Sequence, residues 1–121
     1  MIVVDASVLI AHLDESDVLH ARAEAALLER ADESLGCSPM TLAEVLTGPI
    51  RRGQLAAARR ALADLELEEV ALGEDAAVQL ATIRAQTGLK MPDCCVLLAA
   101  QRTAARVLSF DDELARHAAP S

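Results

Sequence analysis

Aromatic residues are almost missing from this chain of 121 residues, which has one phenylalanine, Phe110, and no tryptophan or tyrosine. A hydrophobic core must therefore be aliphatic, and the 53% hydrophobic content is enough to build one without disulfide bonds. Bases of a nucleic acid have no set of aromatic side chains on which to stack. We expect any binding of nucleic acid to depend on phosphate contacts or on a metal ion.

Cysteine and long apolar runs are also scarce. Cys37, Cys94 and Cys95 cannot all pair and lack zinc-ligand spacing, so we expect small buried side chains in a reducing cytosol. No apolar run approaches the roughly 20 residues that cross a bilayer. The N-terminus "MIVVDASVLIAHLDE" has no basic segment and reaches Asp5 early, unlike a signal peptide. We expect a soluble, cytoplasmic protein that does not bind membranes.

Basic residues are outnumbered, because 11 Lys and Arg face 19 Asp and Glu, a formal net charge of -8. This charge repels nucleic acid and favours cations or a basic partner. The densest positive stretch, "IRRGQLAAARRAL", is either an RNA-binding patch or a solvated helix face. Its arginines are the candidate RNA contacts: Arg51, Arg52, Arg59 and Arg60.

Short apolar segments alternate with amphipathic ones along the whole chain. We expect strands at residues 2–5, 35–38, 65–72 and 105–110. Helices are expected directly after the first strand, over residues 16–30, 39–47, 53–65, 73–88 and 111–118, and from Pro92 onward through Asp93. Ser16 is a predicted N-cap, with Val18 and Leu28 on its helix's apolar stripe, and Gly48-Pro49 is expected to break or kink the next helix. This order predicts an α/β fold, a single domain over residues 1–121 with a mostly parallel central sheet flanked by helices.

Four acids fall at junctions of the predicted elements. Asp5 ends the first strand, Glu44 lies one turn inside the helix after the second, Asp93 is in a first helical turn, and Asp111 follows the last strand. Each acid alone also fits a cap or a solvated position. Together they are expected at the carboxyl edge of the sheet, where binding sites of such folds collect. Converging carboxylates repel one another, so they either take up protons or hold a cation.

Oxygen ligands of this kind favour Mg²⁺ or Mn²⁺ over zinc. Such an ion supports hydrolysis of phosphodiester bonds, which makes a nuclease the leading hypothesis. We also expect the N-terminus of its helix to favour the ionised form of Asp93. Two other folds that group acids in this way do not fit. A receiver module needs a second acid beside Asp5 and a lysine near the end of the chain, and an aspartyl phosphatase needs DxD in place of "DAS".

The motifs "VVDASVLIA", "SPMTLAEVLTG", "MPDCCVLLAAQ" and "VLSFDDEL" resemble, in order and rough spacing, those of the PIN-domain family and its VapC-type toxins. The resemblance implies an Mg²⁺- or Mn²⁺-dependent endoribonuclease. It places the metal ligands at Asp5, Glu44, Asp93 and Asp111, with Asp112 as the alternative to Asp111. It also implies supporting hydroxyl groups at three positions: Ser7, Thr41 and Ser109.

The resemblance extends to partners. It implies a small cognate antitoxin that wraps the toxin and brings a basic side chain near the acids, RNA as the substrate, and a homodimer. The alternative is a catalytically weak PIN fold that acts mainly as a protein- or RNA-binding module.

Overall fold

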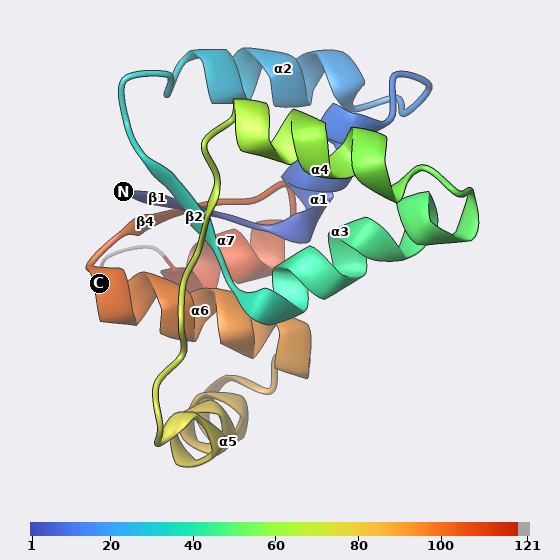
Figure 1. Cartoon of the computed structure of the whole chain (residues 1–121). Helices are drawn as coiled ribbons and strands as arrows, with labels where there is room; N and C mark the ends of the chain where they lie inside the picture. Colours follow the sequence, from blue (N-terminus) through green and yellow to red (C-terminus); the bar gives the residue numbers. More distant parts are fainter. Residues whose placement is uncertain (119–121) are drawn as a thin grey trace.

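The computed structural model describes residues 1–118 and shows an α/β fold built on one sheet (Figure 1). Its strands are β1 (Ile2–Val4), β2 (Leu35–Cys37), β3 (Glu68–Glu69) and β4 (Arg106–Leu108). They lie in the order β3-β2-β1-β4, and every pair is parallel. The predicted fold class and the parallel sheet are confirmed.

Seven helices connect and cover these strands within the described residues. They are α1 (Ala6–Leu13), α2 (His20–Leu28), α3 (Pro39–Arg51), α4 (Leu55–Asp64), α5 (Ala76–Thr87), α6 (Met91–Thr103) and α7 (Asp112–Ala118). Figure 1 shows α1 to α4 on one side of the sheet and α5 to α7 on the other. None of the helices in residues 1–118 combines the length and the apolar character needed to cross a membrane.

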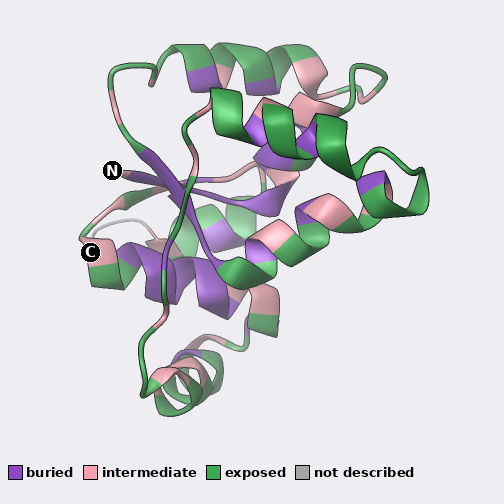
Figure 2. Cartoon of the chain, in the orientation of Figure 1, coloured by how far each residue is buried: buried purple, intermediate pink, exposed green. Residues whose placement is uncertain are grey.

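The core has two parts, one on each face of the sheet, because successive side chains of a strand point to opposite faces. Ile2 and Val4 pack with α1 to α4, whereas Val3 packs with α6 and its neighbours. Helix α6 is buried over Cys94–Ala100, which explains why its sequence is apolar on all sides (Figure 2). The three cysteines are buried and unpaired, as expected.

The predicted start of α2 is wrong. Ser16 lies in a turn, where its N–H and Oγ donate to Oδ1 of Asp14, and the helix begins at His20. Because this turn delays the helix, a different stripe faces the core. Val18 and Leu28 are 96% and 76% exposed, and the buried residues of α2 are Ala23 and Leu27.

Two other boundaries differ from the prediction. Helix α3 continues through Pro49, which is buried, to Arg51, so Gly48-Pro49 does not break it. The third strand shrinks to Glu68–Glu69, since α4 extends to Asp64 and Glu66 then turns the chain at a positive φ of 54°. Both differences arise at helix ends, where local residue patterns define boundaries least well.

Candidate functional site

Four acids predicted from the sequence lie around the carboxyl edge of the sheet. Asp5 directly follows β1, and its N–H donates to the carbonyl of Leu108 at the end of β4 at 2.9 Å. Glu44 lies in α3, the helix after β2. Asp93 is in the first turn of α6, and Asp111 lies between β4 and α7. Parallel strands bring these chain positions to one edge although they are up to 106 residues apart.

Asp5 is the fixed point of the site. It is 7% exposed, and its Oδ1 accepts a hydrogen bond from the N–H of Ala6 at 2.8 Å. Its Oδ2 accepts from the hydroxyls of Ser7 at 2.9 Å and Ser109 at 2.8 Å. These donors satisfy the buried carboxylate and hold its orientation.

The same two hydroxyls tie β1 to the segment after β4. Ser7 Oγ accepts the N–H of Phe110 at 3.1 Å, and Ser109 Oγ accepts the N–H of Asp111 at 2.9 Å. Each serine therefore donates to Asp5 and accepts from a backbone N–H in the segment after β4. This network positions Asp111 relative to Asp5.

Glu44 and Asp93 respond to the charge of the neighbouring acids. Burial raises the pKa of Glu44, and the charges of Asp5 and Asp93 raise it further. Burial also raises the pKa of Asp93, followed by the charges of Asp5 and Asp111. The expectation that the N-terminus of α6 favours the ionised form of Asp93 stays a prediction, and burial and the neighbouring acids act against ionisation.

Two charged residues at this edge were missed in the sequence. Lys90, next to the start of α6, lowers the pKa of both Glu44 and Asp93, so its ammonium group lies within electrostatic range of both. Glu113 in α7 raises the pKa of Asp93. Lys90 is the chain's single lysine and stands three residues before Asp93, a signal that could have identified it.

The geometry distinguishes Asp111 from Asp112. Oδ1 of Asp111 accepts from the N–H groups of Glu113 at 3.0 Å and Leu114 at 3.2 Å, so this carboxylate caps α7. The charge of Asp111 also acts on Asp93, and among the described residues Asp112 is not one of the groups that shift the pKa of Asp93. Asp112 is an exposed residue of α7.

Thr41 supports α3 from within. Ser38 is the N-cap of this helix, and its Oγ accepts the N–H of Thr41 at 3.0 Å. The two hydroxyl oxygens are 3.1 Å apart, and both residues are buried. Thr41 thus fixes the first turn of the helix that carries Glu44.

The donor set suits a hard cation, since it consists of carboxylates whose mutual repulsion a divalent ion would relieve. In residues 1–118, however, no three Asp, Glu, His or Cys side chains already stand in an arrangement that could hold a metal ion. Asp5 is fixed, whereas Glu44 is exposed and Asp93 half-buried, so these two side chains have room to turn toward it. The residues fit the ion by chemistry and require side-chain rotation to surround it.

The four candidate RNA-binding arginines are exposed, and two of them line cavities. Arg52 lines a cavity of about 120 Å³ between α1 and α3 together with Glu44. Arg59 lines a different cavity, of about 420 Å³, between α3 and α4. Arg51 and Arg60 are exposed. Arg52 is therefore the arginine that shares a cavity with a candidate ligand.

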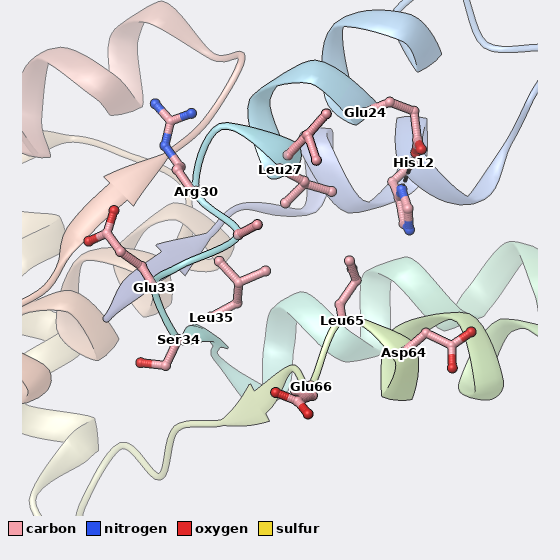
Figure 3. Close-up of a pocket in the computed structure, with 12 residues that line it drawn as sticks. His12, Glu24, Leu27, Arg30, Glu33, Ser34, Leu35, Asp64, Leu65 and Glu66 are labelled. Atoms are coloured by element: carbon pink, nitrogen blue, oxygen red, sulfur yellow. Dashed lines mark hydrogen bonds and ion pairs between the residues drawn. The ribbon is translucent and has the colours of Figure 1, made fainter.

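Another cavity, of about 360 Å³, lies among α1, α2, α4 and the start of β2 (Figure 3). His12 and Glu24 form an ion pair at its wall. The residues that line it include none of the four acids. This hollow is thus separate from the carboxyl-edge site.

Comparisons with known proteins find the same fold and a family match. One chain in a toxin–antitoxin complex from Klebsiella pneumoniae shares the fold with a TM-score of 0.76 at 24% identity, over 92% of this chain and 87% of that chain. VapC20 of Mycobacterium tuberculosis, a toxin that cleaves the sarcin–ricin loop, gives a TM-score of 0.75 at 20% identity, over 97% and 95% of the two chains. A search of curated proteins gives no match. The family model of the PIN domain matches residues 2–120, and the chain therefore belongs to the PIN-domain family.

Proposed function

We propose that this protein is a metal-dependent endoribonuclease, the toxin of a toxin–antitoxin pair. The observation that carries the proposal is the edge where Asp5 is held by two serine hydroxyls while neighbouring acids raise the pKa of Glu44 and Asp93. Membership of the PIN-domain family supports nuclease activity. The fold shared with VapC20 supports RNA as the substrate.

In this proposal Asp5, Glu44, Asp93 and Asp111 hold Mg²⁺ or Mn²⁺. The bound ion supplies positive charge for a phosphate oxygen and lowers the pKa of a water molecule. The placement of Asp111, through its effect on Asp93, supports it over Asp112 as the fourth ligand. Ser7 and Ser109 keep Asp5 oriented, and Thr41 holds the first turn of α3 beneath Glu44.

The raised pKa values of Glu44 and Asp93 predict a pH dependence. Both carboxyl groups retain their protons to a higher pH than ordinary carboxyl groups, and a protonated carboxyl group is a poor metal ligand. Activity should therefore fall as the pH is lowered through the raised values. Lys90 opposes this effect by favouring ionisation of both acids.

Binding of RNA by a chain of net charge -8 requires local positive charge. We assign the first phosphate contact to Arg52, which shares a cavity with Glu44, and weaker contacts to Arg51, Arg59 and Arg60. The acidic surface in turn suits a basic antitoxin segment whose arginine pairs with the carboxylates.

Two further parts of the proposal concern the assembly and the compartment. Ile50 is 57% and Leu55 36% exposed beside the cavity between α3 and α4, which supports a homodimer through aliphatic helices. Light scattering after size-exclusion chromatography, with and without the antitoxin, tests this assembly. Three buried free thiols support action in the reducing cytoplasm.

The central test is cleavage of structured RNAs by the pure protein with and without Mg²⁺. We expect cleavage that EDTA blocks and that Asp93→Asn abolishes without loss of folding. Asp112→Asn, which removes an exposed acid nearby, is the matched control and should retain activity. If the wild type binds RNA without cleaving it in Mg²⁺ or Mn²⁺, the chain is a binding module and the nuclease proposal fails.

A further inference from the structure

The single aromatic ring of the chain lies beside the Asp5 network. Phe110 stands between Ser109, which donates to Asp5, and Asp111. Its N–H donates to Ser7 Oγ at 3.1 Å, so its backbone is part of the same network. The ring is partly buried against the core cluster that contains α1. Its position is therefore set by both the site and the core.

Arg22, from α2, covers this ring. Its guanidinium carbon lies 4.3 Å from the ring centroid, within the range of about 6 Å for attraction between a cation and an aromatic face. Arg22 is an exposed residue, and the ion pairs found in residues 1–118 do not include it. Phe110 thus gives a contact to an arginine that is otherwise open to solvent.

We propose that the guanidinium plane of Arg22, ordered on Phe110, is a stacking surface for one nucleobase of the RNA next to the carboxyl-edge site. The inference rests on the proposed nuclease function and names a residue that holds its substrate. Composition alone excluded a set of aromatic platforms, yet an arginine plane can serve the same purpose, because unpaired bases of RNA stack on guanidinium groups as well as on aromatic rings.

A stacked base suits this place better than a phosphate contact alone. The neighbouring acids repel phosphate groups, whereas stacking uses the uncharged face of the base. The guanidinium carbon of Arg22 lies over the Phe110 ring, and Arg22 is exposed, so the group can also meet a base from solvent. The pair would hold a flanking nucleotide while the carboxylates act on the phosphodiester bond.

The test measures the affinity of a fluorescein-labelled single-stranded RNA by fluorescence anisotropy, in the full chain carrying Asp93→Asn so that the RNA stays intact. We expect Arg22→Ala to raise Kd about fivefold or more, the loss of one stacked base. Arg22→Lys keeps the charge but not the plane, and should lose nearly as much. Arg116→Ala, an exposed arginine of α7, controls for net charge and should change Kd by less than about twofold.

Abasic RNAs identify the stacked nucleotide. Removing the base at one position should weaken binding to the parent chain and abolish the difference between the parent and Arg22→Ala. Equal affinities of Arg22→Ala and Arg116→Ala would overturn the proposal, and so would full affinity of Arg22→Lys, which indicates a phosphate contact. Thermal melting confirms that each variant folds.

The outcome separates this inference from the nuclease itself. If Arg22→Ala binds RNA like its control while Asp93→Asn still abolishes cleavage, the stacking surface is wrong and the nuclease stands. If wild type neither binds nor cleaves RNA, the proposed function fails first.

Discussion

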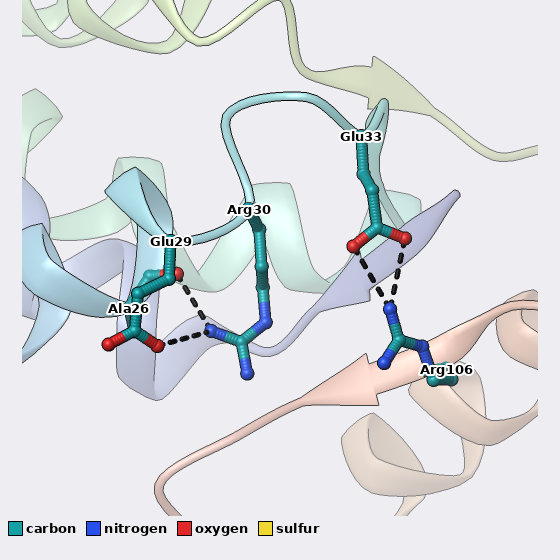
Figure 4. A network of polar contacts seen from close by, with 5 residues as sticks. All are labelled: Ala26, Glu29, Arg30, Glu33 and Arg106. Atoms are coloured by element: carbon teal, nitrogen blue, oxygen red, sulfur yellow. Dashed lines mark hydrogen bonds and ion pairs between the residues drawn. The ribbon is translucent and has the colours of Figure 1, made fainter.

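The charged side chains at the two ends of the parallel strands differ in whether they form ion pairs. At the amino end, Arg106 of β4 donates from Nη2 to both oxygens of Glu33, before β2, at 2.9 and 3.0 Å (Figure 4). Nearby, Arg30 lies 3.6 Å from the carboxylate of Glu29 and donates to the carbonyl of Ala26. At the carboxyl end, the ion pairs of residues 1–118 include none of the four clustered acids.

This difference indicates which charged residues have a structural role. The exposed ion pairs at the amino end contribute a little stability, and each charge already has its partner within the protein. At the carboxyl end, burial and the charges of neighbouring acids raise the pKa of Glu44 and Asp93, which means that the ionised forms of these two groups are repelled in the free protein. A protein tolerates such repulsion where a bound cation, a substrate or a partner relieves it. Acids with perturbed pKa values in a cleft therefore indicate a functional site.

The most severe way to break the carboxyl end is Asp5→Asn. This change keeps the shape but removes the charge that both serine hydroxyls orient. We expect RNA cleavage in Mg²⁺ to fall about a hundredfold or more, since even the groups that orient a ligand account for 10–100-fold. Gel-based cleavage assays measure it, and melting temperature controls for folding. Activity near the wild-type level would remove Asp5 from the site.

A milder change at the same end is Ser109→Ala, which deletes one donor to Asp5 and the acceptor for the N–H of Asp111. We expect metal affinity or activity to fall by about 10–100-fold. Isothermal titration with Mn²⁺ gives the affinity directly. Thr82→Ala is the matched control, because that hydroxyl only donates to its own helix at Val78. Equal effects of the two changes would show that Ser109 has no special role.

Substitution of single arginines tests which basic residue near the carboxyl end contacts RNA. Arg52→Gln should weaken RNA binding and reduce the slope of log affinity against log salt by about one, as expected for one lost phosphate contact. Arg60→Gln removes an equal charge from an exposed position of α4 and should change the slope less. A salt titration of RNA affinity compares them. Identical slopes in both variants would indicate that Arg52 is not a privileged contact.

The smallest effects compare stability at the two ends. Glu44→Gln removes a repelled acid and should stabilise the metal-free protein at neutral pH. Glu33→Gln breaks the pair with Arg106 and should destabilise it by at most about 1 kcal/mol. Urea unfolding measures both free energies, and opposite signs are the expected result. Destabilisation by Glu44→Gln would mean that Glu44 is not repelled by the other acids at the carboxyl end.

The pH dependence of the Glu44 effect has a definite sign. Burial and the charges of Asp5 and Asp93 raise the pKa of Glu44 in the folded protein above that of an ordinary glutamate, so the folded state keeps a proton that the unfolded state releases. The stability of the metal-free wild type therefore falls as the pH rises through this window. Glu44→Gln should lose that part of the fall, and its advantage should vanish below the window. A constant difference from acid to neutral pH would contradict the assignment.

Much of the site was predictable because it depends on chain order. The β-branched run before Asp5 and the apolar run after Asp93 determine where these acids enter the fold, and a parallel sheet then brings them to one edge. The start of α2 was not predictable in this way, since the Asp14 turn competes with the helix for Ser16. That Arg52 and Arg59 line different cavities was also not predictable, because the packing of α3 and α4 determines these cavities.

By itself the sequence determined an aliphatic α/β fold with four acids at strand and helix ends, because hydrophobic periodicity and junction residues are local properties. Only the tertiary structure decided which groups interact with one another. It fixed Asp5 between hydroxyls separated by 102 positions of the chain, raised the pKa of Asp93 through burial and neighbouring acids, and placed Arg22 on Phe110. Hydrogen bonds and Coulomb interactions depend on distance in space, which periodicity along the chain does not specify.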